Sequence, residues 1–197
     1  MAQFSAPGYS RIPQIFHQVT VVWKHLAHPN IVPLLGATMD PPQLISDRMP
    51  GGDLIEFITG QPYADRRSLV SGFSTFCACC SLPRQLSDVA KGLNHLHSRN
   101  IVHGDLKGVG DRSRSGLTTW LTPRQANILV DASGHARITD FGLAVVTQDL
   151  DLVRSGSDEC GDSVRWIAPE ILDGRGTHSE EGDVFSFAMV MIEVCCI

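Results

Sequence analysis

The sequence has few lysines, no Asp or Glu before Asp40, and no long uninterrupted apolar run. Only three of its sixteen basic residues are lysines, and its formal net charge is -5. Such a chain offers no broad electrostatic attraction to nucleic acid or to an anionic membrane surface, so neither partner is expected. The longest apolar stretch, residues 184–197, is shorter than the roughly 20 residues of a membrane span. Because residues 1–11 also lack a signal-peptide pattern, the sequence predicts a cytoplasmic protein.

Regular cysteine spacing is also absent. The six cysteines occur in clusters that lack the paired spacing of a disulfide framework, and the chain shows no secretory signal. Reduced thiols are therefore favoured over disulfides. A zinc site on Cys77, Cys79 and Cys80 is not favoured, because no second pair of ligands follows downstream.

The length of 197 residues, with 43% apolar and 19% charged residues, fits one globular domain. Local patterns predict a mixture of helices and strands. Asp53 stands at an N-cap position before a short helix. The predicted elements are a helix ending near Leu26, strands at 31–36 and 43–49, helices at 54–58 and from Ser87, and a hairpin of 128–130 with 136–138. The helix from Ser87 carries Val89, Ala90, Leu93 and Leu96 on one face.

Three polar residues match the needs of phosphoryl transfer. This reaction requires oxygen ligands for the metal ions that bridge the nucleotide phosphates, and one carboxylate that orients the attacking hydroxyl. Asp105, Asn127 and Asp140 supply such a set.

Four motifs around these residues resemble those of the eukaryotic protein kinase family, and they occur in the order of that family. They are the catalytic loop at 103–107, the Asp-Phe-Gly motif at 140–142, Ala-Pro-Glu at 168–170, and the helix at 183–187 that anchors the catalytic loop through its Asp. Any one triplet is weak evidence, but four in this order are a strong joint signal. The segment 164–167 resembles the tyrosine-kinase-like branch, whose members are mostly Ser/Thr enzymes.

The resemblance implies an α+β, protein kinase-like fold with a partial N-lobe sheet and a truncated, mainly helical C-lobe. One partial domain would then span 1–197, with a remnant of the N-lobe and hinge at about 19–49 and the C-lobe at 50–197. The implied cofactors are ATP and Mg²⁺, and the implied partner is a protein substrate. The oligomeric state stays open.

The same resemblance assigns individual roles. Asp105 would be the catalytic base, and Lys107 would neutralise the transferring phosphate and indicate Ser/Thr substrates. Asn127 and Asp140 would bind magnesium. Gly104 replaces the usual Arg, which argues against switching by a phosphate on the activation loop. The residues implied to bind the nucleotide are Ser46, Asp47, Met49 and Leu129.

Several family features are missing from the sequence. It has no Gly-rich loop, no lysine in a Val-Ala-x-Lys strand, and no acidic residue near Gln18 or Val19, where the family places a glutamate that pairs with this lysine. Phosphoryl transfer is therefore expected to be impaired. A non-catalytic binding or scaffolding module is the alternative, and a chain without a stable fold is a third possibility.

Two segments, 70–85 and 109–125, interrupt the family pattern. Asn127 follows Asp105 by 22 residues where the family has five, which predicts that the second segment disturbs the metal site. Removing both segments restores the loop spacing and a continuous helix pattern. Both begin with Val and end with Pro-Arg-Gln, compatible with intron borders, so we hypothesise two retained introns.

Overall fold

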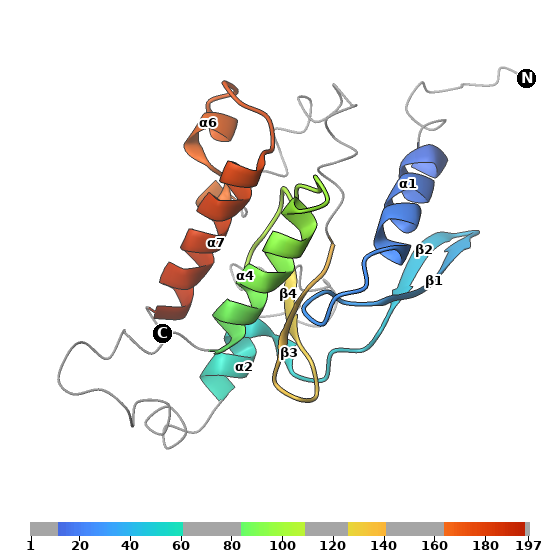
Figure 1. Cartoon of the computed structure of the whole chain (residues 1–197), viewed down its shortest axis with the longest axis horizontal. Coiled ribbons are helices and arrows are strands. Elements are labelled where there is room, and N and C mark those ends of the chain that lie inside the picture. The colour runs from blue at the N-terminus through green and yellow to red at the C-terminus, as the bar shows by residue number, and fades with distance from the viewer. Residues whose placement is uncertain (1–11, 61–83, 109–125, 141–163, 196–197) are drawn as a thin grey trace, which may run out of the picture.

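The computed structural model describes residues 12–60, 84–108, 126–140 and 164–195 (Figure 1). These residues form an α+β structure with helices and two small antiparallel sheets, one of two strands and one of three. In chain order the elements are α1 (Ile12–Lys24), β1 (Leu34–Met39), β2 (Pro42–Ser46), β3 (Gly52–Asp53), α2 (Leu54–Gly60), α4 (Arg84–His97), β4 (Ile128–Val130), β5 (Ala136–Ile138), the 3-10 helix η2 (Val164–Trp166), α6 (Pro169–Leu172) and α7 (Glu180–Cys195).

The two-stranded sheet lies next to α1 (Figure 1). Its strands pair from Leu34 opposite Ser46 to Met39 opposite Pro42. The sequence predicted both strands, but it began the first strand at Ile31, three residues before its observed start at Leu34. The apolar side chains of Ile31 and Val32 belong to the core and not to this strand. Both are buried, and the backbone N–H of Val32 donates to Ile138 O at 2.9 Å. The apolar run therefore marks a core segment that precedes the strand.

The three-stranded sheet has the order β3-β4-β5. The predicted hairpin of 128–130 with 136–138 is confirmed, with Ile128 opposite Ile138. Buried Asn30 ties the segment before β1 to this hairpin, since its side chain donates to Ala136 O at 3.1 Å and its carbonyl accepts from Ile138 N at 2.9 Å. The predicted cap is also confirmed, because Asp53 Oδ1 accepts from Glu56 N at 2.7 Å.

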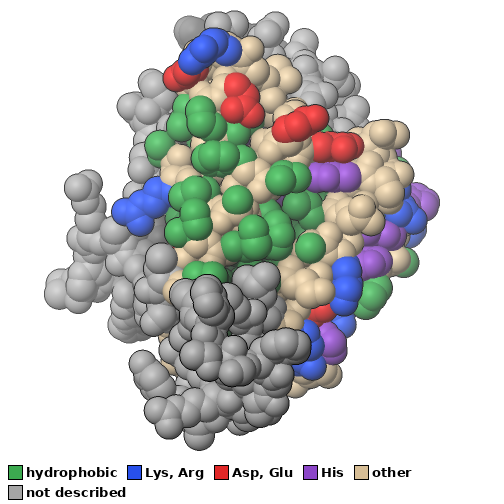
Figure 2. Space-filling model, turned by 60° about the vertical axis from the view of Figure 1, so that its left-hand side comes forward, with side chains coloured by type: hydrophobic (Ala, Val, Ile, Leu, Met, Phe, Trp, Pro, Cys, Tyr) green, Lys and Arg blue, Asp and Glu red, His purple; other side chains and the backbone are tan. Residues whose placement is uncertain are grey.

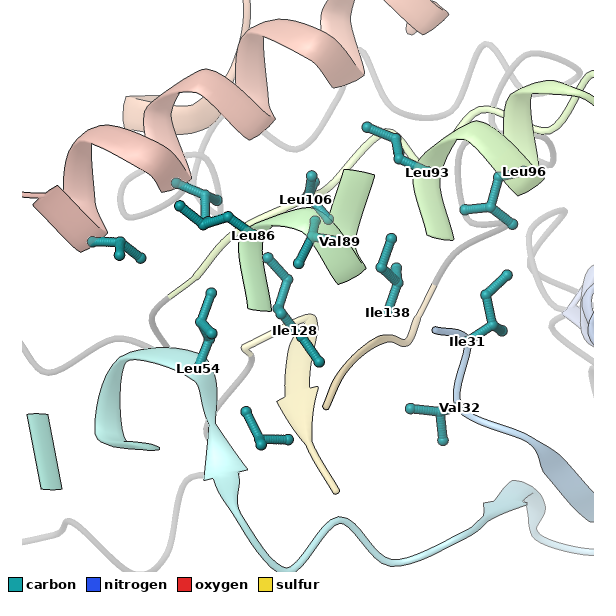
Figure 3. Packing of buried hydrophobic residues seen from close by; sticks show 14 of the residues in the cluster. Ile31, Val32, Leu54, Leu86, Val89, Leu93, Leu96, Leu106, Ile128 and Ile138 are labelled. Atoms are coloured by element: carbon teal, nitrogen blue, oxygen red, sulfur yellow. The ribbon is translucent and has the colours of Figure 1, made fainter. Parts of the chain in front are cut away.

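The core lies between α4 and the three-stranded sheet (Figure 3). Its fully buried large side chains are Ile31, Val32, Leu54, Val89, Leu96, His103, Leu106, Ile128, Val130, Ile138 and Val190. Three of the four residues predicted for the buried face of α4 are buried, but Ala90 is exposed. The stripe follows Leu86, Val89, Leu93 and Leu96, spaced by three or four residues, and Ala90 falls outside it.

Helix α4 begins at Arg84, three residues earlier than predicted. Arg84 Nη2 and Gln85 Nε2 donate to Gly134 O at 3.2 and 2.8 Å, so contacts with the hairpin turn fix the first turn of the helix. Buried Asp88 adds a polar link, because its Oδ2 contacts His135 Nδ1 at 2.9 Å. These hairpin residues are about 50 positions away in sequence. A local sequence pattern therefore does not predict that the helix begins at Arg84.

Gly92 is the point of closest approach between α4 and the segment at Asn30. A Cβ added at Gly92 would lie 2.7 Å from Asn30 O and 3.0 Å from Ile138 Cδ1. We therefore expect Gly92→Ala to lower the free energy of unfolding by about 1–3 kcal/mol, because overpacking outweighs the gain in helix propensity. Urea denaturation measures this, with Asn94→Ala as the control at an exposed position of the same helix. Equal stability of the two variants would contradict the close approach.

Helix α7 lies beside α4 (Figure 1), and it also packs against η2. It buries Asp183, Ser186, Val190 and Val194 but leaves Val184 and Ile192 more than half exposed. Figure 2 brings forward the side of the molecule on which α6 and α7 lie in Figure 1, and it shows hydrophobic side chains gathered there. Among the described helices, none combines the length and apolar character needed to cross a membrane.

Candidate active site

The loop at 103–108 follows α4 and is held in place by α7. The buried carboxylate of Asp183 accepts hydrogen bonds from the backbone N–H groups of His103 and Gly104, both at 2.8 Å. The sequence predicted that Asp183 anchors the loop, and the structure confirms it. Because each carboxylate oxygen accepts one backbone N–H, the loop is fixed in both position and orientation.

His97 contributes to the same anchor. Its Nε2 lies 2.8 Å from Asp183 Oδ2. No local sequence pattern predicts this contact, because Asp183 follows His97 by 86 residues. A histidine in the last turn of a helix gives no local signal for such a contact.

His103 is fully buried at the start of the loop. Its Nδ1 accepts from Asp105 N at 3.2 Å, so Nε2 carries the proton and donates to Thr139 O at 3.1 Å. Burial lowers the pKa of His103 below its usual value, which keeps the ring neutral. This neutral ring joins the loop to the residue before Asp140.

Asp105 lies at the centre of the candidate site. Its Oδ2 accepts from Lys107 Nζ at 3.0 Å and from Asn127 Nδ2 at 2.9 Å, while Asn127 Nδ2 also donates to the carbonyl of Asp105. The side chain of Asp105 is 37% exposed and that of Lys107 only 9%. Asp105 can therefore be reached from solvent, whereas the two groups that orient it are largely enclosed.

Asn127 lies beside Asp105 although 22 residues separate them in sequence. The expectation that this separation displaces Asn127 from the loop is therefore corrected. The chain leaves the loop at Gly108 and returns at Ala126, and Asn127 N donates to Lys107 O at 3.3 Å. Because its amide nitrogen makes both side-chain bonds to Asp105, the amide oxygen is left as the atom that can ligate a cation. Backbone hydrogen bonds to Lys107 and Thr139 therefore hold Asn127 beside Asp105.

Asp140 follows directly after this pairing. Thr139 N donates to Asn127 O at 3.0 Å, and Asp140 itself has a positive φ of 57°. Although its side chain keeps an exposed surface, desolvation raises the pKa of Asp140, and the negative charge of Asp105 raises it further. A bound cation would offset both effects.

The chemistry of these donors fits magnesium. Mg²⁺ prefers oxygen ligands, usually one or two protein groups with water and phosphate oxygens completing its shell. The Asn127 amide oxygen and the Asp140 carboxylate are such groups. Within the described ranges no cluster of three or more His, Cys, Asp or Glu side chains could hold a metal by itself.

The residues predicted to bind the nucleotide lie around β2, β3 and β4. Ser46 ends β2, and Asp47 and Met49 lie on the segment that connects the two sheets. Asp47 N donates to Pro33 O at 3.2 Å, and Met49 packs against the core. Leu129 is in β4, opposite Asp53 of β3.

Some predictions lie outside the described residues. These concern Phe141 and Gly142, most of the segment 70–85, the whole of 109–125, and the cysteines at 77–80. The Ala-Pro-Glu motif is described: buried Ala168 precedes α6, which begins with Pro169.

Comparison with known proteins agrees with this geometry. A family model described as protein tyrosine and serine/threonine kinase matches residues 9–109 and 123–197. The unmatched residues between these ranges fall within 109–125.

Three relatives show the extent of the similarity. Serine/threonine-protein kinase STY46 of Arabidopsis thaliana is 27% identical over 187 residues, covering 94% of this chain and 27% of that protein. Serine/threonine-protein kinase CTR1 of the same organism is 29% identical over 195 residues, covering 95% and 19%. Dual specificity protein kinase pyk3 of Dictyostelium discoideum is 29% identical over 167 residues, covering 85% and 10%. The chain therefore spans roughly a quarter or less of the length of these relatives.

The family match covers most of the chain, and it contains the Asp183-anchored loop, the Asp105 cluster and Asp140. The chain belongs to the protein tyrosine and serine/threonine kinase family.

Proposed function

We propose that this domain binds Mg-ATP and transfers the terminal phosphoryl group to Ser or Thr hydroxyls of proteins. The observation that carries the proposal is the convergence of Lys107 Nζ and Asn127 Nδ2 on one oxygen of Asp105, Oδ2. The other oxygen, Oδ1, is then oriented to accept the proton of an incoming hydroxyl.

Each remaining residue has a defined part in this proposal. Lys107 would balance the charge of the phosphoryl group as well as that of Asp105. Asn127 and Asp140 would hold Mg²⁺, which neutralises charge on the phosphates when it is bound. Ser46, Asp47, Met49 and Leu129 would contact the nucleotide. Serine and threonine are the proposed acceptors because STY46 and CTR1 carry that specificity in their names, whereas pyk3 is named as dual specificity.

A second candidate function is a nucleotide-binding or scaffolding module without transfer. The observation that favours it is the composition of α1, which contains no Asp or Glu from Ile12 to Lys24. A kinase-type lysine that grips the phosphates would find no carboxylate partner on this helix. Because α1 offers no such carboxylate, we propose that any transfer by this chain is slow. We also propose the cytoplasm as its compartment and proteins as its partners.

We also propose that residues 109–125 are an insert, and that 70–85 is a second one. The family match omits 110–122, and Asn127 N donates to Lys107 O across that segment, which supports the first insert. The match runs through 70–85, so the second insert rests on the sequence pattern of its two ends. Transcripts that lack both segments would support retained introns. If every transcript contains both, the intron hypothesis is wrong.

Mg-ATP binding and transfer can be tested on the chain itself. We expect Mg²⁺-dependent ATP binding by calorimetry, weakened at least about tenfold in Asp140→Asn, because a metal ligand is lost. Asp173→Asn, which changes an exposed carboxylate near α6, is the matched control. Radiolabelled phosphate should appear on Ser or Thr of casein. Binding without transfer would establish the second candidate in its nucleotide-binding form. Absence of Mg²⁺-dependent binding would overturn the transfer proposal and leave only the scaffolding role.

A further inference from the structure

The segment before β1 meets α4 through two stacked histidine rings. His28 lies between α1 and β1, and His95 lies in the last turn of α4. Their ring centroids are 4.4 Å apart and their planes differ by 28°. Both residues are half-buried. This stack therefore joins the part of the chain that carries α1 and the two-stranded sheet to the helix that covers the core.

Hydrogen bonds determine where the two neutral rings carry their protons. His95 Nδ1 accepts from Arg99 Nη1 at 3.0 Å, because a guanidinium group can only donate. His28 Nδ1 accepts from the backbone N–H of Asn30 at 3.1 Å. In both rings the proton therefore lies on Nε2. A second proton would have to bind at Nδ1, so protonation of either ring breaks one of these hydrogen bonds.

The charges that act on the stack are positive. Lys91 precedes His95 by one turn of α4, and Arg99 follows His95 by four residues. Burial lowers the pKa of His28, and the charges of Arg99 and Lys91 lower it further. Burial also lowers the pKa of His95, with added contributions from Arg99 and His28. His95 Nε2 is buried without a hydrogen-bond partner among the described residues, so no acceptor at that atom stabilises a charged ring.

Carboxylates on the surrounding elements do not offset these charges. Within the described ranges, no ion pair joins an Asp or Glu side chain to His28, His95 or Arg99. Titratable groups of α4, α7, the hairpin and the end of α1 contact other partners: Asp88 with Lys91 and His135, Asp183 with His97, Asp131 with Arg137, and His25 with Val21 O. A proton taken up by the stack therefore meets cations and no paired anion.

A simpler explanation is that the two rings only fill the space between the segment and α4. A phenylalanine at position 95 would do so without placing an unpartnered polar atom in a buried position. The backbone after His28 is also tied to the core, because Val32 N and the Asn30 carbonyl both pair with Ile138. A change at His28 is therefore passed to a segment whose backbone hydrogen bonds can be measured.

We propose that the His28–His95 stack is a proton-sensitive joint, which holds the segment 28–32 against α4 while both rings are neutral and loosens when either ring is protonated. The proposal concerns the docking of two parts of the chain, and it does not rest on the kinase function. In the folded chain the pKa of each ring lies below its ordinary value of 6.5, so the unfolded chain takes up protons first as the pH falls. The stabilisation is therefore present above about pH 6.5 and is lost as the pH falls through the folded-state pKa.

Three variants separate the ring charge from the stacking. His95→Phe keeps an aromatic ring that cannot be protonated, and Arg99→Gln removes the neighbouring cation while both rings stay. His25→Phe is the matched control, because it removes an exposed histidine three residues before His28. All forms are compared as the whole chain.

Native-state hydrogen exchange of the Val32 amide, which donates to Ile138 O, reports on the joint. Between about pH 7.5 and about pH 5.5, its protection factor should fall about five- to tenfold in the wild type and in His25→Phe. In His95→Phe the loss should be about twofold, because one titrating ring is gone, and in Arg99→Gln it should be intermediate. An equal loss in His95→Phe and in the wild type would overturn the proposal.

Proton NMR titration of the ring Hε1 resonances gives a second readout, with His95→Phe providing the assignment. Both rings should titrate below pH 6.5 in the folded wild type, and Arg99→Gln should raise the pKa of His95 toward that value. If His95→Phe does not fold, the wild-type titration and Arg99→Gln still decide. Titration of both rings at or above pH 6.5 would show that the stack does not resist protonation, and the proposal would be wrong.

Discussion

Asp105→Asn should lower the rate of phosphoryl transfer by about 10²- to 10⁴-fold, the range for loss of a positioned acid–base group. The amide oxygen can take the place of Oδ2 and accept from Lys107 and Asn127, so the local geometry should persist. What is lost is the second oxygen as a proton acceptor. Transfer to casein under saturating Mg-ATP measures the effect.

The substitution is informative because its structural cost should be small. Mg-ATP affinity should remain within about twofold, and the free energy of unfolding within about 1 kcal/mol, since the hydrogen bonds to Lys107 and Asn127 can be kept. Lys107→Met, which removes the charge beside Asp105, should also slow transfer. Wild-type transfer by Asp105→Asn would show that another group acts as the base.

Asp183→Ala should have the largest effect on stability. The buried carboxylate accepts from two backbone N–H groups and contacts His97, and its removal leaves the N–H groups of His103 and Gly104 without this partner. Each buried unsatisfied group costs about 1–3 kcal/mol. We expect the free energy of unfolding to fall by about 3–5 kcal/mol, because several buried hydrogen bonds are lost together.

Urea denaturation of Asp183→Ala and of Val184→Ala provides the comparison. Val184 is the next residue of α7, and its side chain is 56% exposed, so its loss should change stability by no more than about 0.5 kcal/mol. A loss below about 1 kcal/mol for Asp183→Ala would mean that other bonds hold the loop.

Much of the fold follows from local sequence signals. The hairpin of β4 and β5, the cap at Asp53 and the buried stripe of α4 were predicted because each depends on residues a few positions apart. The membership of the kinase family was also predicted, since its motifs are short and occur in a fixed order.

Contacts between distant residues could not be predicted in the same way. His97 and Asp183 are 86 residues apart, and Arg84 finds its acceptors 49 and 50 residues later. The separation of 22 residues led to the expectation that Asn127 is displaced, whereas in the structure Asn127 N donates to Lys107 O and its side chain contacts Asp105. The roles of Ser46, Asp47, Met49 and Leu129 stay predictions.

The anchoring of the catalytic loop by α7 has a consequence for synthesis of the protein. His103 emerges from the ribosome 80 residues before Asp183, which at about 5–20 residues per second is a delay of several seconds. During that interval the nascent chain contains the whole loop but not the carboxylate that orients it. The loop can take up its final conformation only once α7 is made, so the timing of translation sets when the catalytic geometry first forms.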